Sequence, residues 1–132
     1  MKMKRLMGAV FALAVVLALF AGPVSAHHSF AATYLEDQTQ KIDGKIVQFL
    51  LRNPHSFLHV EAPDEKGVMH VWTIEWGGGG VLSSQGVTRD SLKAGDRVVV
   101  TGQPGRVPEE HRMRMVSLTR PADGWKWGGK FD

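Results

Sequence analysis

The chain has 132 residues, with 16 lysines and arginines, 13 aspartates and glutamates, and no cysteine. The lack of cysteine excludes disulfides, thiol nucleophiles and cysteine-ligated zinc. Three of the basic residues, Lys2, Lys4 and Arg5, stand at the very start, so the rest of the chain has 13 charges of each sign. Such a chain offers no broad positive surface to a phosphate backbone, and we expect no nucleic-acid partner.

Residues 1–26 have the three-part layout of a secretory signal peptide. The positive start is followed by an uncharged, mainly apolar run over 6–21 and by small or short side chains at Val24 and Ala26. The run is about 16 residues long, below the ~20 that span a membrane as a helix. We therefore expect a signal helix cleaved after Ala26, and a periplasmic or secreted protein that does not stay in the membrane.

The first half of the remaining chain is an arm followed by three strand-like segments. Residues 27–40 form the arm, in which Phe30 and Tyr34 are available to pin it to a domain. The strands are expected over 41–51, 56–62 and 68–76, because apolar residues alternate along them. A phase shift at Ile46-Val47, beside Gly44, predicts a bulge or a strong bend in the first strand.

The second half contains a short helix and two more strands. Four glycines end the third strand, and residues 81–85 can form a short helix. Strands are expected over 97–102 and 112–119, which gives a domain over 41–120 and a glycine- and tryptophan-rich tail over 121–132. Five strands with a helix between the third and fourth predict an all-β fold, a small five-stranded OB-like barrel. An open β-sandwich of the same strands is the alternative.

Several short motifs resemble a known family. They are His27-His28-Ser29-Phe30, Asn53-Pro54-His55, Trp72-Thr73-Ile74-Glu75 and the turn Ser91-Leu92-Lys93-Ala94-Gly95-Asp96. In these motifs the chain is similar to the small secreted bacterial proteins of domain-of-unknown-function family 6152. The glycine run over 77–80 and the tail depart from the family pattern. The resemblance implies an exported single-domain protein without an established activity.

The sharpest site hypothesis concerns a metal at the cleaved N-terminus. Cleavage after Ala26 would give His27 a free α-amine beside its own imidazole, and the two nitrogens can chelate one ion. A third histidine nitrogen, from His55 or from His28, would complete a set suited to copper. In the alternative interpretation the two histidines are only a polar start of the chain, and His55 only hydrogen-bonds its own turn.

The other histidines and one acidic residue are weaker candidates. His59 and His70 lie on strands joined by a turn and can face each other, although each is more typical of a half-buried sheet residue. His111 lies in a loop behind two glutamates, where we expect it to be solvated. Glu75 is the acidic residue to watch, because its neighbours are apolar or aromatic.

The tryptophans suggest a different function. Trp72 and Trp76 share a strand face with Ile74, which favours a role in the core, whereas Trp125 and Trp127 are expected to be exposed among glycines. Exposed aromatic residues on an OB-like barrel favour an interaction module for a protein partner or a glycan, without metal. No catalytic motif is complete, so the sequence assigns no catalytic residue and favours a binding protein over an enzyme.

Overall fold

Six strands and three short helical elements follow one another in a computed structural model that describes residues 30–128. The predicted signal peptide, its cleavage site, His27 and His28 lie outside the described residues. The elements are α2 (Phe30–Thr33), β1 (Gln40–Leu50), β2 (Ser56–Pro63), β3 (Met69–Trp76), α3 (Gly79–Ser84), β4 (Arg97–Pro104), the 3₁₀ turn η1 (Pro108–Glu110), β5 (Arg112–Arg120) and β6 (Trp125–Gly128). No helix in this range is long and apolar enough to cross a membrane.

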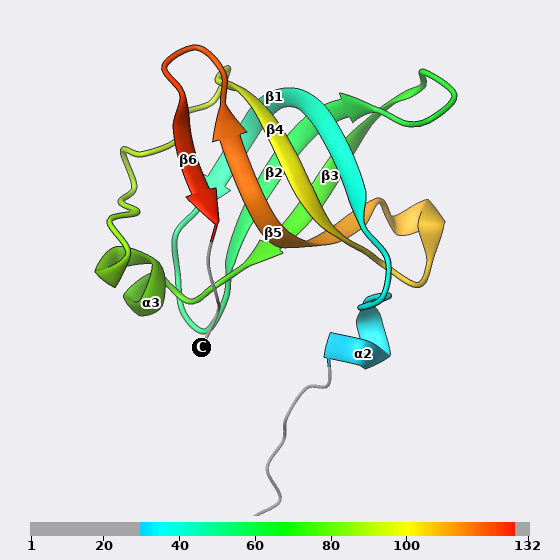
Figure 1. Ribbon diagram of the computed structural model, residues 1–132, viewed down its shortest axis with the longest axis horizontal. Helices are drawn as coiled ribbons and strands as arrows, with labels where there is room; N and C mark the ends of the chain where they lie inside the picture. The colour runs from blue at the N-terminus through cyan, green and yellow to red at the C-terminus, as the bar shows by residue number, and fades with distance from the viewer. Residues whose placement is uncertain (1–29, 129–132) are drawn as a thin grey trace, which may run out of the picture.

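The first five strands close into a barrel (Figure 1). β1 pairs antiparallel with both β2 and β4, β2 continues to β3, and β4 continues to β5. A short parallel pairing between β3 and β5, from Thr73 opposite Arg112 to Glu75 opposite Arg114, completes the circle. The closed circle of strands, with α3 between β3 and β4, confirms the predicted five-stranded OB-like barrel. The alternative, an open β-sandwich, is excluded.

β1 can serve two neighbours because it bends. Its first half pairs with β4 as far as Lys45, and its second half pairs with β2 from Lys45 onwards. The predicted bulge is confirmed, since the register with β2 shifts between Ile46 and Gln48. At the bend β1 and β2 approach so closely that a Cβ on Gly44 would lie 2.1 Å from the carbonyl oxygen of Glu61.

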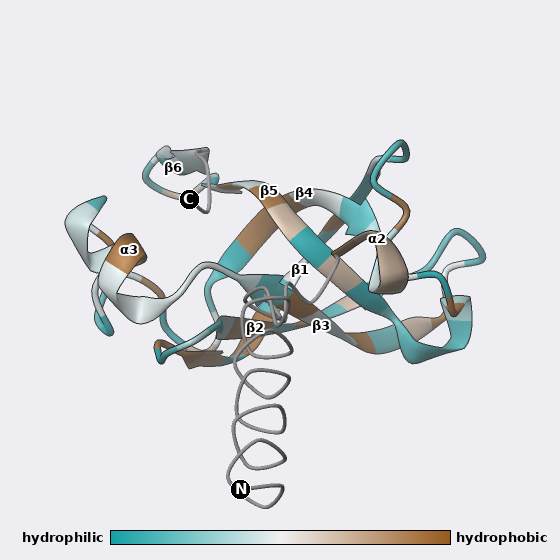
Figure 2. Ribbon diagram, turned by 90° about the horizontal axis from the view of Figure 1, so that it is seen from below, coloured by the Kyte–Doolittle hydropathy of each residue, from teal (hydrophilic) through white to brown (hydrophobic). Residues whose placement is uncertain are grey.

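The core fills the barrel with the inward side of each strand. Buried residues alternate with more exposed ones along β4 and β5. The ribbon of β5 changes colour repeatedly between hydrophobic and hydrophilic (Figure 2). Trp72, Ile74 and Trp76 are all buried, as their shared strand face predicted. Leu82 of α3 is also fully buried and closes the core at the end of the barrel where β3 runs into α3.

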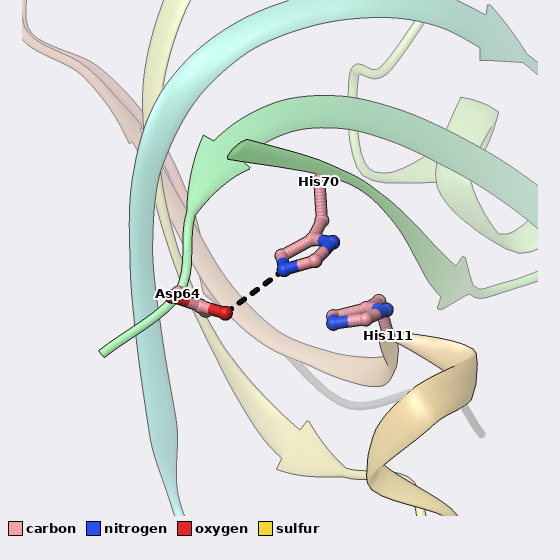
Figure 3. A group of neighbouring side chains, drawn as sticks. All are labelled: Asp64, His70 and His111. Atoms are coloured by element: carbon pink, nitrogen blue, oxygen red, sulfur yellow. Dashed lines mark hydrogen bonds and ion pairs between the residues drawn. The ribbon is translucent and has the colours of Figure 1, made fainter. Parts of the chain in front are cut away.

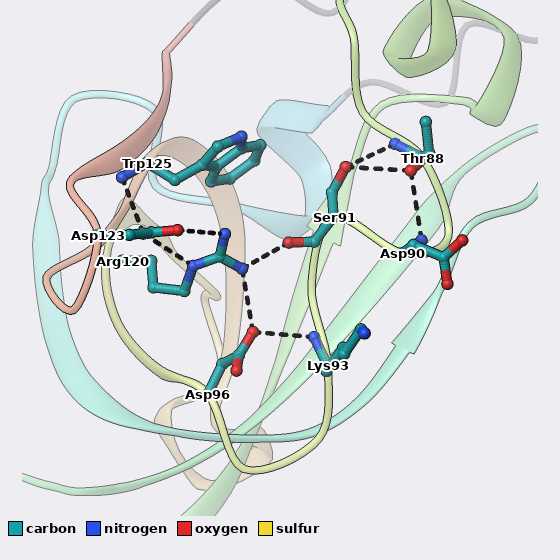
Figure 4. Close-up of polar contacts among 8 residues, drawn as sticks. All are labelled: Thr88, Asp90, Ser91, Lys93, Asp96, Arg120, Asp123 and Trp125. Atoms are coloured by element: carbon teal, nitrogen blue, oxygen red, sulfur yellow. Dashed lines mark hydrogen bonds and ion pairs between the residues drawn. The ribbon is translucent and has the colours of Figure 1, made fainter.

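The tail that was expected after residue 120 contains a sixth strand. β6 pairs antiparallel with β5, with Trp127 opposite Leu118. Arg120 fixes the turn between them (Figure 4): it binds both carboxylate oxygens of Asp123, at 3.0 and 2.8 Å, and reaches Asp96 and the carbonyl of Ser91 in the loop before β4. One guanidinium therefore joins the last hairpin to the rest of the barrel.

Candidate functional site

The Asn-Pro-His motif forms the loop between β1 and β2, and the glycine run lies directly on it. The amide of Gly79 donates to the carbonyl of Arg52 at 2.9 Å, and the amide of Gly80 donates to the side chain of Asn53 at 3.3 Å. A Cβ on Gly78 would lie 2.7 Å from the carbonyl oxygen of Pro54. The glycines therefore allow the backbone before α3 to press against the loop that carries His55.

His55 and Glu75, both candidates from the sequence, are brought together at this loop. Glu75 lies near the end of β3, is 8% exposed, and holds the Nδ1 of His55 through its Oε1 at 2.7 Å. Its Oε2 accepts the hydroxyl of Tyr34 at 2.5 Å and lies 3.7 Å from the guanidinium of Arg112. These four side chains, the Glu75 network, anchor the N-terminal segment to the barrel.

The sequence did not reveal how deeply Tyr34 is involved. Its side chain is fully buried, its backbone bridges to Gly105, and it donates to Glu75. Burial raises the pKa of Tyr34 far above its ordinary value, and the hydrogen bond and charge of Glu75 raise it further. The phenol is therefore held in its neutral, donating form.

This arrangement predicts alkali-sensitive stability. Because the folded pKa of Tyr34 lies above the unfolded value of ~10, its contribution is fully present below about pH 10 and is lost as the pH rises further. We expect the stability difference between wild type and Tyr34→Phe, measured by urea unfolding, to be smaller at about pH 11 than at about pH 8. Tyr34 is the chain's only tyrosine, so tyrosinate absorbance reports it directly. Its appearance near pH 10 in a protein with native circular dichroism would contradict this assignment.

A small pocket opens beside His55. Its volume is about 260 Å³, and its wall includes Phe30, Pro54, Val81 and Arg114 besides His55 and Glu75. The ring of Phe30 lies 5.8 Å from the imidazole of His55 between centroids, and the guanidinium of Arg114 covers the same phenyl ring at 3.7 Å. The pocket therefore combines apolar walls with one imidazole and two charged groups.

A second group of side chains lies where the β2–β3 turn meets the loop between β4 and β5. The ligand atoms of Asp64, His70 and His111 all lie within 4.8 Å of one another, so the group can hold a metal ion (Figure 3). The expectation that His111 is solvated is wrong, because its ring stacks on His70 with centroids 3.7 Å apart. No local pattern could pair these two rings, which come from segments about 40 positions apart. His59 stands opposite Thr73, and His70 stands opposite Ala62, so His59 and His70 do not face each other.

The tail tryptophans do not form the expected exposed pair. Trp127 is 6% exposed, packs edge-on against Trp76, and donates its indole N–H to Gln85 at 2.9 Å. Trp125 is partly buried and packs against the core, with Arg120 over its ring at 5.6 Å. Local composition suggested exposure, but pairing of β6 with β5 turns Trp127 inward. The aromatic platform on which the interaction module depended is therefore not formed by this pair.

Comparison with known proteins identifies the family. A family model described as a family of unknown function, DUF6152, matches residues 14–114. No curated protein and no solved structure matches the chain. The matched range covers most of the chain and includes α2, the barrel as far as the first three residues of β5, and both groups of histidines. The chain therefore belongs to DUF6152, a family of unknown function, as its motifs suggested.

Proposed function

We propose that the protein is exported, is cleaved after Ala26, and binds a copper ion through the amine and imidazole of His27 together with His55. The observation that carries this proposal is the contact between Glu75 and the Nδ1 of His55 at 2.7 Å. Ligand histidines are commonly held by a carboxylate on one ring nitrogen, which orients the ring and leaves the other nitrogen for the metal. In His55 that other nitrogen is Nε2.

The short stretch of chain between His27 and the barrel supports the same assignment. Phe30, the first residue of α2, packs on the ring of His55, and it follows His27 by three residues. Three residues span at most about 10 Å of extended chain. A stretch this short is compatible with a site shared by the His27 amine and His55. His28 is an alternative source of the third nitrogen.

The chemistry of the donors favours copper. An α-amine and two imidazoles supply nitrogen donors, which Cu²⁺ binds in a tetragonal arrangement. The negative charge of Glu75 behind His55 makes the imidazole a stronger donor. The α-amine has a reference pKa of ~7.7–8.0, so the ion competes with a proton and binding should tighten as the pH rises towards 8.

The test is a Cu²⁺ titration of the exported protein, whose intact mass first establishes the N-terminus. We expect His55→Ala, and a protein whose α-amine is acetylated, to bind Cu²⁺ about 100-fold more weakly or worse. His59→Ala is the matched control, because His59 lies on β2 opposite Thr73 and outside the Glu75 network. Equal affinity in the acetylated and the unmodified mature protein would reject the proposal.

A further inference from the structure

We propose that Asp64, His70 and His111 form a second metal site, for one divalent ion of the zinc class, that does not use the N-terminal amine. Its donors are one carboxylate and two imidazoles, a set that suits Zn²⁺, Co²⁺ and Ni²⁺ and not the oxygen-seeking Mg²⁺ or Ca²⁺. All three side chains are in the described part of the chain, and all three are half-buried. The site is therefore independent of the copper hypothesis above.

Asp64 is held in place by its own turn. Its Oδ1 accepts the amides of Lys66 and Val68, at 2.8 and 2.9 Å, and leaves Oδ2 directed at the Nε2 of His70, 2.8 Å away. One oxygen thus fixes the side chain while the other is available to an ion.

The two histidines are presented as a pair. Their rings stack at 3.7 Å between centroids with 17° between the planes, and the edge of Trp72 supports His111 from the side. A neutral imidazole has one nitrogen lone pair for a metal, so the pair can supply two nitrogen donors. When an ion takes the place of the proton on the Nε2 of His70, that proton can move to Nδ1 through solvent.

His111 has a left-handed backbone conformation, which helps to place its ring beside His70. His111 has φ 46° and ψ 52°, and it is the only non-glycine with positive φ among residues 30–128. Its amide donates to Pro108, and its carbonyl accepts the amide of Thr73 at 2.9 Å. The left-handed conformation, which is unfavourable for most side chains, is therefore fixed by β3, the strand that carries His70.

The distances are close to those of a metal site without an ion. Ligand atoms around one tetrahedral Zn²⁺ lie roughly 3.3 Å apart, given metal–ligand distances of ~2.0–2.2 Å. The carboxylate and His70 would have to separate by about 0.5 Å, and the other pairs would have to approach by at most ~1.5 Å, from their 4.8 Å limit. Because the lone pair of an imidazole nitrogen lies in the ring plane, the stacked rings of His70 and His111 would also have to tilt apart to direct both nitrogens at one ion.

Three protein ligands would leave one coordination position open, as in catalytic zinc sites. A surface groove of about 330 Å³ shares Asp64 and His111 with the site and is also lined by Gln40, Trp72 and Pro108. Water or a small anionic ligand can approach an ion from this groove. We therefore assign the open position to exchangeable solvent.

The experiment titrates the protein with its α-amine acetylated, so that the N-terminal chelate is blocked, with Zn²⁺ and with Co²⁺. We expect one ion per chain, a Co²⁺ visible spectrum typical of low coordination number, and a rise in melting temperature with Zn²⁺, because the ion joins the β2–β3 turn to the β4–β5 loop. Asp64→Asn, which keeps the oxygen that accepts the turn amides, and His70→Gln and His111→Gln should each weaken binding by about 10-fold or more.

His59→Gln is the matched control and should bind Zn²⁺ like the wild type. The proposal is overturned if the three variants retain wild-type Zn²⁺ affinity, or if the parent chain takes up no ion while its circular dichroism is native. The two sites fail separately, because the copper hypothesis is tested at His27 and His55 and this one at residues that neither variant touches.

Discussion

Replacing Glu75 with alanine should lower the free energy of unfolding by about 3–5 kcal/mol, the range found when one partner of a buried ionic network is removed. The side chain of Glu75 is 11% exposed. Its carboxylate is the common partner of Tyr34, His55 and Arg112. Without it the buried hydroxyl of Tyr34 has lost its acceptor, and the guanidinium of Arg112 has lost the nearest negative charge. Urea unfolding at neutral pH measures the change.

Two further variants make the result specific. Glu75→Gln keeps the shape and one acceptor oxygen, so it should lose only part of that stability. Glu61→Ala removes a glutamate from an exposed position on β2 and should change the stability by less than ~0.5 kcal/mol. If Glu75→Ala were as stable as Glu61→Ala, the network would be an incidental contact and Glu75 could not be what orients His55.

The second large effect is expected at the bend of β1. Gly44→Ala should destabilise the barrel by about 3 kcal/mol or more, because the new Cβ would lie 2.1 Å from the Glu61 carbonyl oxygen and 2.7 Å from the Ala62 Cβ. The obstacle is the backbone of β2, which cannot move without disturbing its pairing with both neighbours. Thermal unfolding followed by circular dichroism measures the loss.

Gly80→Ala is the matched control for this substitution. Gly80 lies in α3, and a Cβ at this position would meet nothing within 4 Å. Alanine in a helix is favoured over glycine by about 0.5–1 kcal/mol, so this variant should be as stable as the wild type or slightly more stable. If the Gly44→Ala protein had the same melting temperature as the Gly80→Ala protein, β1 would be able to shift at the bend.

The sequence was sufficient to predict the barrel because its strands carry their pattern locally. Alternation along residues 56–62 and 112–119 gave strands within one or two residues of β2 and β5, and the phase shift at Ile46-Val47 marked the bulge. β6 could not be found in this way. It has four residues among glycines, and its strand conformation comes from pairing with β5.

The candidate sites were predictable to a smaller extent. His55 and Glu75 were singled out separately, one by its turn and the other by its apolar neighbours, but only the fold shows that they touch. His111 was missed because its partner His70 is on another strand, and its orientation depends on a backbone conformation that no local pattern indicates. Contacts between distant segments are the information that periodicity does not contain.

The parallel pairing of β3 with β5 has a consequence for motion. It is the shortest ladder of the barrel, running only from Thr73 to Glu75, and short ladders open locally at a lower free energy than long ones. Asp64, His70 and His111 lie beside one end of this seam, where Thr73 pairs with Arg112, and Glu75 lies at the other end. Any transient opening would separate His70 from His111 and Glu75 from Arg112 in the same event. An ion bound by Asp64, His70 and His111 would therefore make local opening rarer at Glu75 as well. The two proposed metal sites would then influence each other although they share no ligand.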